Sequence, residues 1–199
     1  MKAIADSRLI AGLRKAQGGV FSTADLRSAF AEPHPAALGR RIRSLIQQEV
    51  LFRFTRGFYV TGEFDLPVLS QRIAPASCIS FETVLARTLV IGPKPERRVV
   101  ATKVGRPRRY SARGFAIEHV SLSPHLSFGC ESVDGVRMAD TEKAALDVLY
   151  FHLRGRRYAF DIYSDMNLDR LNRARLKEYL RHYANPRFRR FAERVLELT

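Results

Sequence analysis

The sequence predicts an α+β protein built in two parts, and three observations support this fold class. Apolar residues recur at helical spacing in three short segments of residues 1–50, and an alternating apolar hairpin follows them. The middle of the chain contains alternating segments that are typical of strands. The last quarter returns to helical spacing. We therefore expect one domain over residues 1–65, and a mixed α/β domain with a small sheet and C-terminal helices over residues 66–199.

Three helices are expected at the start of the chain. The first covers residues 6–17. Ser22, followed three residues later by Asp25, is a start signal for a second short helix, because both side chains can bond to free backbone N–H groups there. Pro35 suits the first turn of a third helix, which we expect over residues 36–48.

The third helix is predicted to have an apolar face and a basic face. Its apolar residues recur at i, i+4, i+7 and i+8: Leu38, Ile42, Leu45 and Ile46. Four polar side chains on the opposite face could reach base edges in the major groove: Arg40, Arg43, Ser44 and Gln47. Arg41 lies on the flank and is expected to hold a phosphate. The alternative is an ordinary solvated helix face.

A short β-hairpin is expected after the third helix. Residues 51–55 alternate, Arg56-Gly57 forms a turn, and residues 58–60 return. Two helices, a turn, a third helix and a hairpin occur in the order of a winged helix-turn-helix, whose hairpin commonly contacts DNA. Arg53 and Arg56 are therefore expected to contact phosphates. A hairpin that only closes the small core, or a winged helix that binds protein, is the alternative.

Composition agrees with an anionic partner. The chain of 199 residues has 34 Lys and Arg against 20 Asp and Glu, which gives a formal net charge of +14. Such an excess favours association with nucleic acid, although it could also serve solubility or reflect codon preference. No apolar run is long enough to cross a bilayer, and the first residues lack the apolar core of a secretion signal. We therefore expect a cytoplasmic protein with no membrane partner.

The second part mixes strands and helices. A helix is expected over residues 80–88, and four strand patterns follow: residues 97–103, 115–120, near 126–128 and near 136–138. Asp140 is expected to cap a helix, residues 168–183 have the pattern of another, and Asn185-Pro186 begins a final one.

A basic segment between the first two strand patterns is expected to be a turn over residues 105–113. Its arginines could hold phosphate and its tyrosine could stack on a base, so it is a candidate for a second nucleic-acid contact. The side chains in question are Arg106, Arg108, Arg109, Tyr110 and Arg113. A solvated hairpin tip is the alternative.

The sequence contains little that indicates catalysis. Phosphate-loop and nucleophile-elbow motifs are missing, and the five histidines are scattered. Cys78 and Cys130 are expected to be separate, small buried groups, so we expect no metal and no cofactor. Asp140, Glu142 and Lys143 could belong to a metal-dependent nuclease, but the two acids fit better as helix-cap and helix-dipole partners. The protein is therefore expected not to be an enzyme.

Several segments resemble the AbiEi antitoxins of type IV toxin–antitoxin, abortive-infection systems. The resemblance covers most of the chain and rests on five segments: GVFSTADL (19–26), RGFYV (56–60), ISFETVLA (79–86), VVAT (99–102) and RMADTEKAALD (137–147). Each segment is weakly specific alone, and their order and spacing are more specific.

The resemblance implies a winged helix-turn-helix repressor that binds double-stranded DNA at repeats in the promoter of its own operon. It also implies a functional pairing with a nucleotidyltransferase-like toxin, without a stable complex, in which the C-terminal domain counters the toxin. A solitary winged-helix regulator built on the same scaffold is the alternative.

Overall fold

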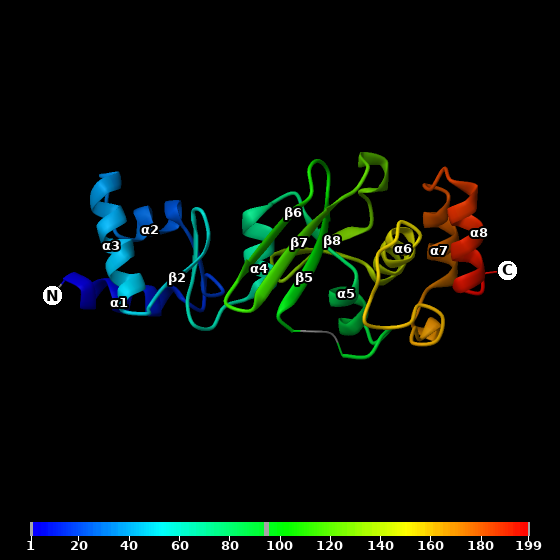
Figure 1. The fold of residues 1–199 in the computed structure, drawn as a ribbon, viewed down its shortest axis with the longest axis horizontal. Coiled ribbons are helices and arrows are strands. Elements are labelled where there is room, and N and C mark those ends of the chain that lie inside the picture. The colour runs from blue at the N-terminus through cyan, green and yellow to red at the C-terminus, as the bar shows by residue number, and fades with distance from the viewer. Residues whose placement is uncertain (1, 94–95, 199) are drawn as a thin grey trace.

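The computed structural model describes residues 2–93 and 96–198. The chain is elongated: three helices lie at the N-terminal end, a large sheet lies in the middle, and a pair of helices lies at the C-terminal end (Figure 1). The expectation of an α+β fold is confirmed, because helices accompany two separate sheets.

The N-terminal end combines three helices with a three-stranded antiparallel sheet of order β1-β3-β2. Its elements are α1 (Lys2–Leu13), β1 (Val20–Ser22), α2 (Thr23–Ala29), α3 (Pro35–Gln47), β2 (Phe52–Thr55) and β3 (Phe58–Val60). Ser22 and Asp25 form the expected capping box, with the Asp25 N–H donating to Ser22 Oγ at 3.1 Å. Pro35 lies in the first turn of α3, as predicted. The helix predicted over residues 6–17 ends earlier, because residues 14–19 form hydrogen-bonded turns.

A small apolar core holds the three helices together. It contains Ile10, Phe21, Leu26, Phe30, Leu38, Ile42, Leu45 and Leu51. Each of these side chains stabilises the fold by roughly 1.5–3 kcal/mol relative to exposure. Three of the four apolar residues predicted for α3 are buried, whereas Ile46 is half-buried at the edge of the core.

The central sheet has six strands in the order β6-β7-β5-β4-β9-β8. They are β4 (Cys78–Ile79), β5 (Arg98–Lys103), β6 (Arg108–Ala112), β7 (Phe115–Ser121), β8 (Cys130–Val133) and β9 (Val136–Ala139). β5 pairs in parallel with β7, and β4 pairs in parallel with β9. The expected sheet is present but has more strands than predicted, because β6 forms where a turn was expected and β4 adds a short central strand. The strand expected near residues 126–128 is replaced by the 3-10 turn η1 (Pro124–Leu126).

Helices cover the sheet and extend beyond it. They are α4 (Leu66–Ile73), α5 (Glu82–Arg87), α6 (Thr141–His152), the 3-10 turn η2 (Leu168–Arg170), α7 (Arg173–Leu180) and α8 (Pro186–Val195). α4 packs on β4, β5, β7 and β9, while α6 contacts α5, β9, α7 and α8. The single helix predicted over residues 168–183 is interrupted, because the Asn172 side chain accepts the Arg175 N–H at 3.0 Å and starts α7 anew.

The two cysteines are joined, which corrects the expectation of two separate thiols. Cys78 on β4 and Cys130 on β8 form a disulfide with a Cα–Cα distance of 6.2 Å. Both strands pair with β9, so the fold brings together two residues that are 52 positions apart. That separation gave no sign of the bond in the sequence.

A row of aromatic rings and several arginine contacts attach the N-terminal part to the central sheet and its helix α4. Phe64 lies edge-on between Phe54 and Phe115, at centroid distances of 6.1 and 4.8 Å. Arg72 on α4 donates to the Val20 carbonyl at 2.9 Å. The contacts of Phe64 with Phe115 and of Arg72 with Val20 cross the predicted boundary at residue 65, which stays a prediction.

Within the described ranges, no helix is long and apolar enough to span a membrane.

Candidate nucleic-acid interface

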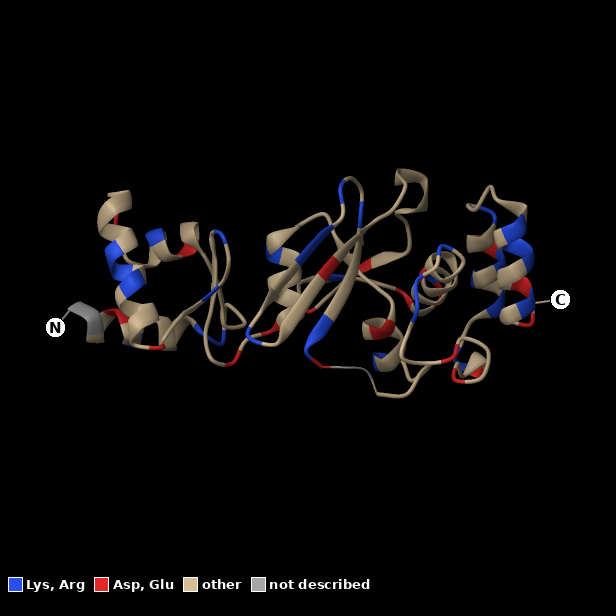
Figure 2. Cartoon of the chain, in the orientation of Figure 1, with Lys and Arg blue, Asp and Glu red and all other residues tan. Residues whose placement is uncertain are grey.

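α3 presents a polar face that points away from the small core. Its buried residues lie on one side, and Arg40, Arg43 and Gln47 are exposed on the other. Figure 2 shows basic positions along α3 and again in the neighbouring hairpin. Within the parts of the chain that the structure describes, Arg40 and Arg43 form no ion pair and no hydrogen bond. Their guanidinium groups are therefore available to an outside partner.

Ser44 belongs to the predicted reading set but is less accessible than the arginines. It is half-buried, and its hydroxyl accepts a hydrogen bond from Gln48 Nε2 at 3.0 Å. The hydroxyl hydrogen of Ser44 can still be donated, since a hydroxyl both donates and accepts. Ser44 therefore fits a secondary contact beside Arg40 and Arg43.

Arg41 is already bonded within the chain, so the geometry gives no support to its predicted role of holding a phosphate, which stays a prediction. Its Nε donates to Asp6 Oδ2 at 2.9 Å, and its Nη1 donates to the Phe30 carbonyl at 3.0 Å. A longer ion pair of 3.7 Å reaches Glu32. The hydrogen bond to Asp6 raises the pKa of Arg41. Arg41 therefore fastens α3 to α1 and to the end of α2, through partners that lie outside α3 and that the sequence did not indicate.

The hairpin places two further arginines in solvent. Arg53 is exposed on β2, and Arg56 is exposed in the turn before Gly57, whose φ of 81° suits glycine. The Thr23 N–H donates to the Gly57 carbonyl at 2.9 Å, which fixes the hairpin turn to the start of α2. Among the described residues, neither Arg53 nor Arg56 has an ion-pair partner. The anchoring bond to Thr23 had no signal in the sequence.

The second basic segment is a strand and not the predicted turn, and its side chains do not form one cluster. Arg108, Arg109 and Tyr110 lie on the edge strand β6. Arg109 Nη2 bonds to Glu118 Oε1 at 2.9 Å, although the side chain of Arg109 is 81% exposed. Tyr110 packs edge-on against His119 at a centroid distance of 5.7 Å.

The remaining two arginines of the segment lie in the turns that flank β6. Arg113 Cζ lies 3.5 Å from the centroid of the Phe52 ring, so Arg113 braces the hairpin. Arg106 and Arg108 are exposed and have no ion-pair partner within residues 2–93 and 96–198. These two remain candidates for a second contact. Charges on an edge strand also hinder its pairing with another chain, which explains them without a ligand.

A cluster of arginines around one carboxylate was missed by sequence reasoning. Glu118 on β7 accepts bonds from Arg98 at 2.9 Å and from both Nη atoms of Arg156 at 3.0 Å, in addition to Arg109. Burial raises the pKa of Glu118, but the bonds from Arg156, Arg109 and Arg98 outweigh it and lower the pKa to about 2. These arginines come from three separate segments and could not be assigned to Glu118 from the sequence.

The three residues considered as a possible nuclease site, Asp140, Glu142 and Lys143, each have partners within the fold. Asp140 caps α6 as predicted, accepting the Lys143 N–H at 2.8 Å. Glu142 accepts the Asn172 N–H at 2.8 Å and pairs with Arg175 at 3.6 Å. Lys143 is buried and pairs with Asp147, which also accepts the Ser80 hydroxyl at 2.7 Å. Over the described ranges, His, Cys, Asp and Glu form no group of three or more that could hold a metal.

Comparison with known proteins reveals a shared fold. No family model matches the chain, and no curated protein matches it. Among solved structures, the crystal structure of the RV2827C protein from Mycobacterium tuberculosis is similar, with a TM-score of 0.64 and 14% sequence identity. The match covers 96% of this chain and 76% of that one. At this identity the likeness establishes the arrangement of the elements and nothing about activity.

Proposed function

We propose that this chain is a DNA-binding transcriptional repressor whose residues 1–65 form a winged helix-turn-helix. In this interpretation α2 and α3 are the helix-turn-helix, α3 enters the major groove, and β2 and β3 form the wing. One observation carries the proposal: α3 turns Arg40, Arg43 and Gln47 outward without ion-pair partners in the described chain, opposite a buried apolar face. The exposed arginines of the hairpin, whose turn is anchored to the start of α2, are a second feature that favours DNA as the partner of this face.

The roles of the side chains follow from their chemistry. Arg40 and Arg43 can each form two bonds to a guanine edge, and Gln47 can do the same at adenine. Arg53 and Arg56 are placed to hold phosphates, which fixes orientation without reading sequence. The net charge of +14 supports attraction of the whole chain to DNA.

We further propose that the protein represses its own operon and counters a nucleotidyltransferase-like toxin without a stable complex. This proposal rests on the resemblance of residues 19–26, 56–60 and 137–147 to AbiEi antitoxins. In the third segment, Lys143 and Asp147 are buried and pair with each other within α6, and Asp147 also accepts the Ser80 hydroxyl. These two residues therefore stabilise α6, and an antitoxic surface must be sought among exposed residues.

The test is binding to the DNA upstream of the gene, measured by fluorescence anisotropy against a shuffled duplex. The double variant Arg40→Ala/Arg43→Ala should lose most of the preference for the upstream DNA, because each good base contact contributes roughly 1–3 kcal/mol. Arg189→Ala/Arg190→Ala is the matched control, since it removes the same charge from the exposed side of α8. Unchanged preference in the α3 variant would show that α3 is not the reading helix.

The dependence on salt separates DNA contact from other uses of the domain. Arg56→Ala should weaken binding to both duplexes alike and lower the slope of log K against log salt by about one. Affinity that does not change with salt would instead favour a winged helix that binds protein.

The antitoxin proposal is tested by co-expressing this protein with a nucleotidyltransferase encoded by a neighbouring gene. Co-expression should relieve the toxicity of the nucleotidyltransferase, and no relief would leave only a solitary regulator.

A further inference from the structure

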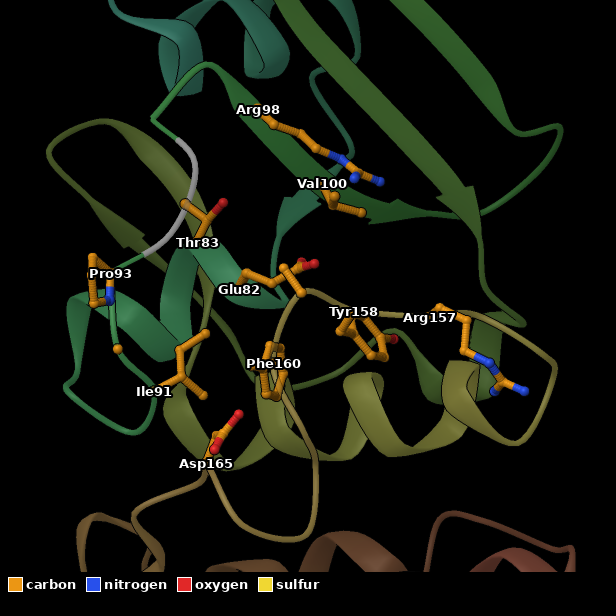
Figure 3. A pocket seen from close by; sticks show the side chains of 12 residues that line it. Glu82, Thr83, Ile91, Pro93, Arg98, Val100, Arg157, Tyr158, Phe160 and Asp165 are labelled. Atoms are coloured by element: carbon orange, nitrogen blue, oxygen red, sulfur yellow. The ribbon is translucent and has the colours of Figure 1, made fainter.

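A cavity of about 420 Å³ lies beside the central sheet, away from α3 and the hairpin. It opens between the start of α5, the strand β5 and the segment that follows α6 (Figure 3). Seven of its twelve lining residues are apolar or aromatic: Ile91, Gly92, Pro93, Val100, Tyr158, Ala159 and Phe160. Its volume and mainly apolar lining are those of sites that bind small molecules in proteins.

The polar groups of the wall differ in how far they are already satisfied. The two Asp165 oxygens accept the Asp161 N–H at 2.7 Å and the Ser164 hydroxyl at 3.2 Å. Arg98 pairs with Glu118 at 2.9 Å. Arg157 is exposed, and Figure 3 shows it extending away from the other labelled side chains. These groups need no ligand.

Glu82 is the exception among the charged groups of this wall. Its side chain is half-buried and extends into the space between the labelled residues (Figure 3). In the part of the chain that the structure describes, its carboxylate has no hydrogen-bond partner and no cation within 4 Å. A carboxylate partly removed from water is costly until a cation or an N–H donor pairs with it.

We propose that this cavity binds a small ligand that joins a flat aromatic body to a protonated amine. The ammonium group pairs with Glu82, and the flat body lies against Phe160 and Tyr158. Aromatic faces attract both planar rings and cations, so the walls favour the same chemistry as the carboxylate. The site is independent of the proposed DNA contacts, because none of its residues belongs to residues 1–65.

The test is isothermal titration of the full chain with tryptamine, an indole that carries a primary ammonium group. We expect saturable binding of one molecule per chain. Glu82→Gln keeps the shape of the side chain and removes its charge, and it should weaken binding by about tenfold or more, since a charge-assisted bond contributes roughly 1.5–3 kcal/mol. Glu178→Gln, at an exposed position on α7, should bind like the parent chain.

Two ligands of different charge complete the design. Indole-3-propionate has the same ring and a carboxylate in place of the ammonium, and AMP has an amino-bearing base and a phosphate. Equal binding of either would overturn the proposal by showing that the ammonium group contributes nothing, and tighter binding would show that the cavity prefers anions. Absence of saturable binding at millimolar tryptamine, or an unchanged Glu82→Gln variant, would also overturn it. If Glu82→Gln does not fold, Phe160→Leu should weaken tryptamine binding, and unchanged binding would overturn the stacking arrangement.

Discussion

Three exposed arginines of α3 and the hairpin differ from the charges of the sheet and its helices in what they face. Arg40, Arg43 and Arg56 face solvent and form no ion pair in the described structure. Around the sheet, three arginines converge on Glu118, and Lys143 is paired with Asp147 in the interior. The comparison teaches that a basic composition does not locate a binding surface. The partner of each guanidinium decides whether it can contact DNA or instead holds the fold together.

The largest expected loss of stability comes from removing one partner of the buried pair Lys143–Asp147. Asp147→Ala leaves the Lys143 ammonium without a partner in a site that is 1% exposed, and it should lower the free energy of unfolding by about 3–5 kcal/mol. Urea denaturation measures this loss. Asp134→Asn removes the charge of a carboxylate that is 87% exposed and keeps a side chain suited to its φ of 52°, so it should change stability by less than about 1 kcal/mol. Similar losses of unfolding free energy in the two variants would show that the buried pair stabilises the fold no more than the exposed one.

The next effect is a dependence of stability on pH at Glu118. Its pKa lies at about 2 in the folded chain against an ordinary value of 4.5. A lowered pKa stabilises the fold above pH 4.5, and this stabilisation disappears as pH falls from about 4.5 towards 2. The difference in unfolding free energy between the parent chain and Glu118→Gln should be about 3 kcal/mol at pH 6 and less than half of that at pH 3. A difference that stays constant over this range would contradict the assignment.

Local signals predicted the N-terminal elements well. The Ser22–Asp25 capping box, Pro35 at the start of α3 and the apolar stripe of α3 involve residues within one or two helical turns, so their geometry follows from spacing. The α+β class followed from the same periodicities. The six-stranded extent of the sheet did not, because β6 reads as a basic turn and β4 is two residues long.

The side-chain partners were not predictable, because they are distant in sequence. Asp6 meets Arg41 from 35 positions away, and Arg113 meets the ring of Phe52 across the two parts of the chain. The disulfide links positions 52 apart. In each case the sequence predicts on which face of its helix or strand a side chain lies. The contact partner of that side chain depends on how the elements pack against one another. The bond between Arg41 and Asp6, which competes with the predicted phosphate contact, was missed for this reason.

The smallest and most specific effects are expected at two adjacent arginines of α3. Arg41 is 15% exposed and Asp6 is 7% exposed, so Arg41→Ala should leave a largely buried carboxylate and cost about 2 kcal/mol of stability. Arg40→Ala should change stability by no more than about 0.5 kcal/mol, because its side chain lies in solvent.

DNA binding should respond in the opposite way at these two positions. At a temperature where both variants are folded, Arg40→Ala should weaken binding to the preferred duplex by about 1–3 kcal/mol, and Arg41→Ala should leave the base preference unchanged. Thermal unfolding and anisotropy measured on the same preparations separate the two roles. If Arg41→Ala alone removed the preference, the contact with Asp6 would have to open when DNA binds, and the division between fold-holding and DNA-facing arginines would not apply to α3.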